Sequence, residues 1–293
     1  MASHRGCGMA LKDLLVYLDG TEAALVRLRL AVDLARRHGS HLTVLYVSEL
    51  SAEQLHELST AELGLVSAEQ LDELNRRLEA SIDRAAAPLK SRLQTLGKEH
   101  HLTVEWGFVK GLASTAALQH ARYVDLSILG HGADGDSVGY SVSEQLLFVA
   151  GRPVLFIPTV GSFSTLGRHI VVAWNSSRPA ARAVNDALAL IERADRITVL
   201  AVNPADFIGR HYAPPIEWLV EHLRRHGADA DVVQLENIPA ASIGDALQAE
   251  ACALGADLLV AGAFGHPKVW EKLLGGVTCD LLARMTLPIL MSH

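Results

Sequence analysis

Residues 13–49 read DLLVYLDGTEAALVRLRLAVDLARRHGSHLTVLYVSE, and residues 169–204 read HIVVAWNSSRPAARAVNDALALIERADRITVLAVNP. Each stretch has the pattern of a strand, a polar turn, an amphipathic helix and a second strand. The second strands, HLTVLYV and RITVLAV, match almost letter for letter. The same structural unit is therefore written twice in the chain, and this repeat decides the fold.

The ends of the two copies also correspond. They are YVDLSILGHG (123–132) and RPVLFIP (152–158) in the first copy, and GADLLVAGAFG (255–265) and LPILMSH (287–293) in the second. The second copy is shorter in its middle, because residues 52–97 of the first copy have no counterpart. These residues have room for a helical insertion and a long amphipathic helix from residue 68 to 96. We expect this helix to cover its own sheet, although its length also suits a partner interface.

Short, nearly continuous apolar runs mark the strands, as in LLVYL, LTVLYV, TVEWGFV, DLSIL and PVLFI of the first copy. Continuous rather than alternating apolarity indicates parallel strands that helices cover on both faces. Strands that alternate with helices predict an α/β, doubly wound fold. The stretch TVGSFSTLGR (159–168) reads as a linker, so we predict two tandem domains, residues 9–160 and 166–293.

The composition is that of a globular protein with a sizeable core, since 49% of the 293 residues are hydrophobic and 20% are charged. A formal net charge of -7 argues against a nucleic-acid partner, which requires a basic face. No apolar run is long enough to span a membrane, and the N-terminal MASHRGCG lacks the apolar region of a signal peptide. The three cysteines are isolated, so we expect a cytoplasmic protein without a metal site built from His or Cys.

The stretch GAFGHPKVWEKLLGGVT (262–278) follows the run that we predict to be the fourth strand of the second copy. In an open parallel sheet, ligands bind beyond the carboxyl ends of the strands, where the strand order reverses. Glycines there would let a phosphate approach the backbone, and the start of the next helix would supply N–H groups. The alternative is that the glycines only form turns and Thr278 only caps the helix. The candidate phosphate-binding residues are Gly262, Gly265, His266, Gly275, Gly276, Val277 and Thr278.

The spacing G-x2-G-x9-G that begins at Gly262 resembles the nucleotide-binding signature of the universal stress protein family. The first strands LVYLDGT and VVAWNSS and the fourth strand ADLLVAG are similar to that family as well, and the resemblance runs from about residue 12 to 293. It implies a five-stranded parallel sheet of order 3-2-1-4-5 in each domain, flanked by helices. It also implies that ATP, or a related adenine nucleotide, lies across the switch point of the C-terminal domain, and that the strands PVLFIP and LPILMS pair the two domains as an internal pseudo-dimer.

The resemblance assigns further residues to the nucleotide site. The backbone at Val202 would meet the adenine, and Trp174 would either stack on the ligand or pack in the core. The residues implied on this side of the site are Ala173, Trp174, Asn175, Val202 and Ala261.

The sequence departs from the family pattern at two positions. Gly276 stands where Ser or Thr is usual, which removes a hydroxyl donor and leaves the backbone N–H. Asn175 stands where ATP-binding relatives have Asp, and a neutral amide holds Mg²⁺ far less well than a carboxylate. We therefore expect no metal site and no metal-assisted binding in the second copy.

The first copy keeps the Asp, as Asp19, but lacks the glycine spacing. Asp19 would either contact a ligand or cap the following helix. The string GHGADG (130–135) has a dinucleotide-type spacing, but it follows the fourth strand instead of opening the first βαβ unit, so we read it as a polar loop or a degenerate pocket. The residues of this second candidate pocket are Asp19, Gly130, Ser141 and Ser143.

Other sequence motifs exclude functions or indicate surface. No GxxxxGK[ST], GxSxG or HExxH string occurs, which excludes a P-loop ATPase, a serine hydrolase elbow and a zincin. Arginines on the predicted helices are interleaved with acids, and we interpret them as solvated surface; they are Arg27, Arg29, Arg36, Arg37, Arg224 and Arg225.

Three functions follow from these patterns. The first is a stress-response protein that binds an adenine nucleotide in its C-terminal domain as a regulatory ligand and possesses a surface for homodimerisation. The second is a slow ATP hydrolase. His266 is the candidate base nearest to the predicted site for this function, and we assign no catalytic residue. The third is an interaction protein that acts through dimerisation without a nucleotide. The spacing within residues 262–278 favours the first.

Overall fold

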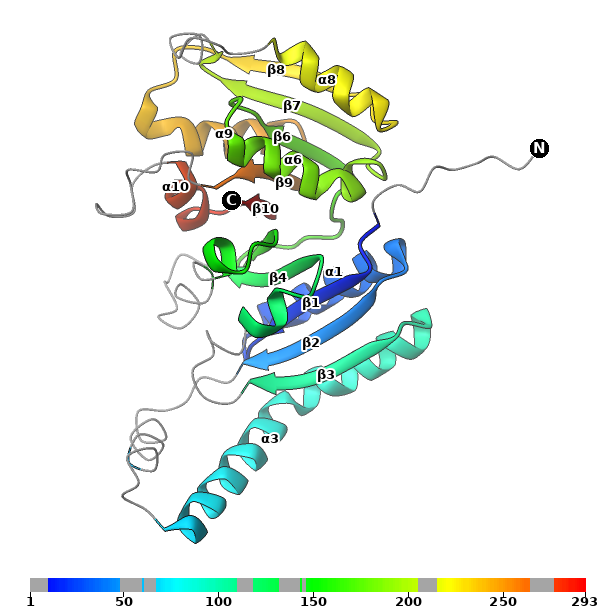
Figure 1. The fold of residues 1–293 in the computed structure, drawn as a ribbon, viewed down its shortest axis with the longest axis vertical. Coiled ribbons are helices and arrows are strands. Elements are labelled where there is room, and N and C mark those ends of the chain that lie inside the picture. Colours follow the sequence, from blue (N-terminus) through cyan, green and yellow to red (C-terminus); the bar gives the residue numbers. More distant parts are fainter. Residues whose placement is uncertain are drawn as a thin grey trace, which may run out of the picture.

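The structure is a computed structural model, shown in Figure 1, and its two halves stack along the long axis of the molecule. It describes residues 10–47, 60, 67–109, 118–131, 143, 146–204, 215–263 and 277–293. Within these residues, one continuous sheet runs through both halves, and helices cover its two faces.

The described part of the chain has ten strands in one sheet, of order β3-β2-β1-β4-β5-β10-β9-β6-β7-β8. All neighbouring strands are parallel except β5 and β10. Each half therefore has the order 3-2-1-4-5, which confirms the predicted doubly wound α/β fold. The strands are β1 Asp13–Leu18, β2 His41–Val47, β3 Val104–Val109, β4 Leu126–His131, β5 Val154–Pro158, β6 His169–Ala173, β7 Arg196–Val202, β8 Asp231–Leu235, β9 Leu258–Gly262 and β10 Ile289–Ser292.

The helices form a layer on each face of the sheet. One layer contains α1 (Ala23–His38), α3 (Ala68–His100), α6 (Arg178–Ile191) and α8 (Ile216–Arg225), whose apolar residues join one core cluster. The other contains α9 (Ile243–Ala253), preceded by a 3-10 turn at Ala240–Ser242, and α10 (Val277–Ala283). The inner strands of the sheet are nearly all buried, as their continuous apolar runs predict, whereas the edge strands β3 and β8 are half-buried to exposed.

The ends of these helices follow from local residue chemistry. A capping box starts α3, in which Ser67 accepts from the N–H of Gln70 and the Gln70 side chain accepts from the N–H of Ser67. The helix is a few residues longer than predicted. Leu78, Ile82 and Leu89 are buried against the sheet, whereas its first turns extend past the sheet edge (Figure 1).

Two aspartates at equivalent positions of the repeat anchor the first strand of each half. The Asp125 carboxylate accepts hydrogen bonds from the backbone N–H groups of Lys12 and Asp13, at 2.6 and 3.0 Å. The Asp257 carboxylate accepts from the N–H groups of Arg168 and His169, at 2.9 and 3.0 Å. Each carboxylate precedes the fourth strand, so it fixes where the first strand begins relative to the fourth.

The two halves meet where β5 and β10 pair antiparallel, with Leu155 opposite Leu290. This pairing of PVLFIP with LPILMS agrees with the expectation from the family resemblance. Both apolar core clusters contain residues from each half, so the core is continuous across this seam.

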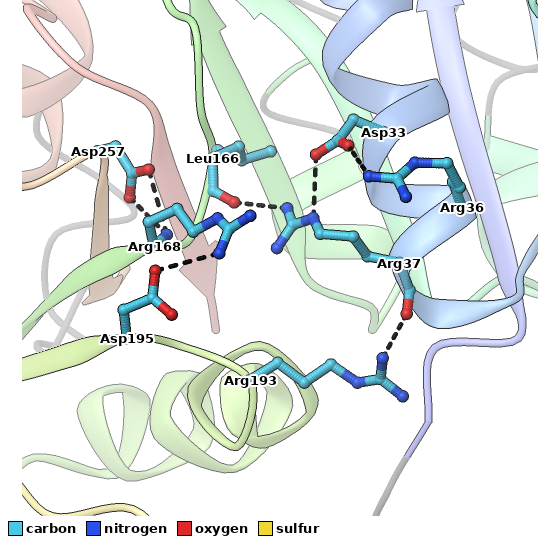
Figure 2. Close-up of polar contacts among 8 residues, drawn as sticks. All are labelled: Asp33, Arg36, Arg37, Leu166, Arg168, Arg193, Asp195 and Asp257. Atoms are coloured by element: carbon cyan, nitrogen blue, oxygen red, sulfur yellow. Dashed lines mark hydrogen bonds and ion pairs between the residues drawn. The ribbon is translucent and has the colours of Figure 1, made fainter.

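Arginines close the seam on the α1 side, as Figure 2 shows. Arg193 donates to the carbonyl oxygen of Arg37, and Arg37 donates to the carbonyl oxygen of Leu166 in the connecting segment. The Arg37 side chain is only 14% exposed and also pairs with Asp33 at 3.0 Å. The interpretation of Arg37 as solvated surface was therefore wrong, because its largely buried guanidinium donates to the carbonyl oxygen of Leu166 and to Asp33.

No helix in the described ranges is both long enough and apolar enough to cross a membrane.

Candidate functional site

The strand order reverses at two places, between β1 and β4 and between β6 and β9. At each place the loop after the first strand and the end of the fourth strand lie at the same edge of the sheet. Asp19 and Gly130 flank the first of these switch points, and Asn175 and Gly262 flank the second. These four residues were among the predicted site residues, and the sheet topology gives each pair the same position in its half.

The loop after β6 forms a tight turn into α6. The Asn175 side-chain oxygen accepts from the N–H of Ser177 at 3.1 Å, and the Ser177 hydroxyl accepts from the N–H of Ala180 at 3.3 Å. Ser176 between them has a φ of 56°, in the left-handed region that few non-glycine residues adopt. Ser177 thus caps α6, and the side-chain oxygen of Asn175 stabilises the turn by accepting one hydrogen bond. Trp174 is half-buried and packs against the core cluster, which favours its packing role.

Gly262 ends β9 directly against the first turn of α6. A methyl group added at Gly262 would lie 2.4 Å from the Ala180 nitrogen and 2.4 Å from the Pro179 carbonyl carbon. The glycine is therefore needed for close helix packing, whatever its part in ligand binding. The contact brings the start of α6, and the positive end of its dipole, beside the end of β9. Ala261 precedes it in the strand and is buried.

Val202 ends β7, and the residue that follows it joins two loops. Asn203 has a φ of 48°, its side-chain amide donates to the Ile238 carbonyl at 2.6 Å, and its side-chain oxygen accepts from the Ile238 N–H at 3.0 Å. This pair of bonds holds the loop after β7 to the loop after β8. Sequence reasoning did not single out Asn203 as a site residue, although Asn directly after a strand tolerates a left-handed turn better than most residues.

The start of α10 faces α9 at close range. A methyl group at Gly244 would lie 2.8 Å from Cβ of Asp280 and 3.3 Å from the Val277 carbonyl oxygen. Thr278 is buried, and Val277 is half-buried. The remaining predicted residues of this loop, Gly265, His266, Gly275 and Gly276, lie outside the described residues.

The C-terminus also reaches this side of the molecule. His293 Nδ1 lies 3.0 Å from the carbonyl oxygen of Ala263, the residue after β9. The His293 ring also meets the ring of Phe148, edge to face, with centroids 5.3 Å apart. Phe148 belongs to the N-terminal half, so His293 connects this half with Ala263, the last described residue before the glycine-rich loop.

The switch point of the N-terminal half contains an ion pair. Nη2 of Arg27 lies 2.6 Å from the Asp19 carboxylate, whose other oxygen accepts from the N–H of Thr21 at 3.0 Å. Partial burial raises the pKa of Asp19, but the Arg27 charge and the Thr21 hydrogen bonds outweigh it and leave this pKa below its ordinary value. Asp19 therefore shapes the turn before α1 and binds Arg27, but it does not cap the helix, because the N-cap of α1 is Glu22 and no side chain makes a capping hydrogen bond there.

Arg27 itself is 1% exposed, so its interpretation as solvated surface was wrong. It lies on the inner face of α1 and extends under the loop after β1, where Asp19 compensates its charge. Of the other predicted residues in this pocket, Ser143 is buried and Ser141 lies outside the described residues. Across the described ranges, no three His, Cys, Asp or Glu side chains lie close enough to hold a metal ion.

Comparisons with known proteins agree on one family. The sequence model described as "Universal stress protein family" matches residues 10–158. A search of curated protein sequences returns no match.

Among solved structures, a universal stress protein from Archaeoglobus fulgidus DSM 4304 is 16% identical, with a TM-score of 0.66; the match covers 96% of this chain and 95% of that one. A protein from Pseudomonas aeruginosa UCBPP-PA14 with the same family designation is also 16% identical, with a TM-score of 0.55, covering 97% of this chain and 93% of that one. At these identities, the two structures support the fold.

A shorter solved structure is described as a universal stress protein in complex with cAMP. It is 23% identical, with a TM-score of 0.32, and the match covers 43% of this chain and 96% of that one. The family model spans more than half of the chain, and the two full-length structural matches share its fold. The chain therefore belongs to the universal stress protein family.

Proposed function

We propose that the chain is a two-domain universal stress protein, with domains at residues 9–160 and 166–293, that binds an adenine nucleotide such as ATP in its C-terminal domain as a regulatory ligand. The observation that carries the proposal is the place of the glycine spacing. It begins at Gly262, the last residue of β9, beside β6 at the reversal of strand order, and its final glycines directly precede α10.

The surroundings of Gly262 support an anionic ligand. The first turn of α6 abuts this glycine and contains no acidic residue, so the helix dipole is not offset there. Thr278, at the start of α10, supplies a hydroxyl on the far side of the loop. Phosphates of a nucleotide would thus lie between the start of α6 and the start of α10.

The loops after β6 and β7 support the base and ribose end of the same ligand. Parallel strands place their carboxyl ends at one edge of the sheet, so Asn175 and Val202 lie on the side where β9 ends. The Asn203 bonds to Ile238 fix the backbone after Val202, which suits recognition of a flat base by main-chain groups. Asn175 is neutral and already accepts from Ser177, so we expect binding that does not depend on Mg²⁺.

Titration of the purified protein with labelled ATP, with and without EDTA, tests this proposal. We expect saturable binding that EDTA leaves unchanged, and Thr278→Val should weaken it by about 5- to 10-fold, which is the loss of about one hydrogen bond. Thr286→Val is the matched control and should leave ATP binding unchanged. It removes a hydroxyl beyond the C-terminal end of α10, where the Thr286 hydroxyl donates to the Gln248 side chain at 3.2 Å.

Two outcomes would contradict the proposal. One is the absence of saturable binding up to about millimolar ATP, an affinity too weak for a dedicated site. The other is binding that Gly265→Val leaves unchanged, because a branched side chain at this glycine would block close approach of a phosphate. A mass spectrum of small molecules released from the denatured, freshly purified protein would identify the bound nucleotide directly.

A further inference from the structure

A buried arginine occupies the switch point of the N-terminal half. The Arg27 side chain is 2% exposed, and its guanidinium group lies 2.6 Å from the Asp19 carboxylate. A methyl group at Gly130 would lie only 1.5 Å from Nη1 and 2.8 Å from Cζ of Arg27. The guanidinium therefore lies directly over the end of β4, between this strand and the loop after β1.

The C-terminal half is built differently at the same position. In the alignment that matches residue 13 with residue 169, the counterpart of Arg27 is Ala183, which is 1% exposed. The counterpart of Gly130 is Gly262, whose nearest neighbours are backbone atoms of Pro179 and Ala180. No cation lies over the end of the fourth strand among these neighbours. The two switch points share their topology. Besides the glycine spacing, which only the second copy has, they differ in whether a side chain fills them.

We propose that Arg27 closes the N-terminal switch point to nucleotides by filling the space over the end of β4 in which a ligand would lie. The chain then takes one nucleotide, in its C-terminal half. The nature of the ligand rests on the proposed function, whereas the closure rests on Arg27 alone. Displacing the guanidinium would break its charge-assisted bond to Asp19, and Nε of Arg27 has no hydrogen-bond partner among the described residues that could replace this bond.

Removal of Arg27 is compatible with a folded chain. The Asp19 side chain is 36% exposed, so its carboxylate stays hydrated when the guanidinium is absent. Alanine is also the residue that the second copy has at this position. The variant Arg27→Ala therefore gives the first switch point the side chain of the second one.

Photolabelling with 8-azido-ATP, followed by peptide mapping, tests the closure in the full chain. We expect label only in peptides of the C-terminal half in the wild type, and label in both halves in Arg27→Ala. Arg36→Ala is the matched control, because Arg36 lies on the same helix with a side chain that is 48% exposed, and it should give the wild-type pattern. Label in the N-terminal half of the wild type would overturn the inference, as would a folded Arg27→Ala protein without label there. Absence of label from the C-terminal half of the wild-type protein would instead count against the proposed function.

A double-mutant cycle tests the position of Arg27 without any ligand. Gly130→Ala should lower the melting temperature of the wild type, because the added methyl group collides with the guanidinium. The same change in an Arg27→Ala background should leave the melting temperature unchanged, since the colliding group is gone. An equal decrease in both backgrounds would show that Arg27 does not lie over Gly130, and would overturn the inference even if photolabelling of the variant failed.

Discussion

At the residue scale, two glycines at equivalent strand ends are required for different physical reasons. Gly130 leaves room for the end of a flexible side chain, Arg27, whereas Gly262 leaves room for the backbone of Pro179 and Ala180. A side chain can rotate away from an added methyl group, but a helix backbone cannot do so without moving the helix. We therefore expect Gly262 to be the less tolerant of the two.

The variant Gly262→Ala should lower the free energy of unfolding by about 1–3 kcal/mol, the usual cost of overpacking a buried site. Urea denaturation measures this difference. Gly20→Ala is the control, because a methyl group there has only the Tyr46 hydroxyl at 3.5 Å, an ordinary contact. Its free energy of unfolding should stay within about 0.5 kcal/mol of the wild type. Equal stability of Gly262→Ala and the wild type would contradict the packing of α6 on β9.

His38 should make the stability depend on pH. It is buried, and neither ring nitrogen has a hydrogen-bond partner. Burial, followed by repulsion from Arg193 and Arg37, lowers the pKa of His38 from 6.5 to about 4. The unfolded chain then binds this proton at a higher pH than the folded one, so stability is lost as the pH falls from 6.5 to 4, by up to roughly 3 kcal/mol.

Chemical denaturation between pH 7 and 4.5 measures this loss. His38→Leu should reduce the slope in that window, and the remaining slope belongs to His169 and His222, whose pKa values burial also lowers. Asp19 does not interfere, because its pKa is lowered from 3.8 and its own contribution is lost only below the window. An identical slope for the wild type and the variant would contradict the assignment of this effect to His38.

At the element scale, the strands and their order were predictable, whereas the contents of the switch points were not. Continuous apolar runs predicted parallel strands covered on both faces, and the repeat transferred each assignment to the second half. Helical spacing also predicted an inner face of α3 formed by Leu71, Leu74, Leu78, Ile82 and Leu89. The last three are buried, whereas Leu71 is exposed and Leu74 half-buried, because the first turns of α3 extend past the sheet edge (Figure 1). Periodicity places an apolar residue on an inner helix face, but it gives no reason to place an arginine there.

Arg27 and Asn203 therefore escaped prediction. We interpreted Arg27 as part of the charged surface of α1. Its burial depends on a contact with Gly130, which is distant in sequence, and its partner Asp19, which is close in sequence, does not reveal that contact. The role of Asn203 depends on Ile238, which lies on a different loop. Contacts between loops distant in sequence follow from the sheet topology, which only the structure supplies.

The pairing of α9 with α10 should be essential for the candidate nucleotide site. Gly244→Val would push α10 away, because even its first added carbon would lie 2.8 Å from Cβ of Asp280. We expect a loss of about 1–3 kcal/mol in the free energy of unfolding. ATP titration should also show weaker binding, since Thr278 moves with the helix. Ala249→Val, an exposed position on the same helix, is the control and should leave binding unchanged.

At the scale of the whole molecule, the two halves form one sheet and one pair of core clusters. β5 is buried along its whole length, and within the described ranges β10 pairs with the edge of β5 that faces away from β4. A half without its partner would expose an apolar strand edge, which is a template for pairing with another chain. The seam arginines of Figure 2 would lose their carbonyl partners as well.

The fragment of residues 9–160, produced alone, should therefore associate into dimers or larger species. Size-exclusion chromatography with light scattering measures its mass, and the full chain under the same conditions provides the reference. A stable, monodisperse monomer of the unmodified fragment would contradict the dependence of the fold on the β5–β10 pair.

Hydrogen–deuterium exchange of the full chain, with and without ATP, tests most directly that the nucleotide binds in the C-terminal half. We predict that ATP slows exchange in peptides covering residues 173–177, 202–204 and 261–279, where the loops after β6, β7 and β9 and the start of α10 meet the ligand. Peptides around Asp19 and Gly130 should exchange at the same rate in both samples, because Arg27 fills that switch point. Protection around Asp19 and Gly130, or no protection in the C-terminal half at saturating ATP, would contradict the account.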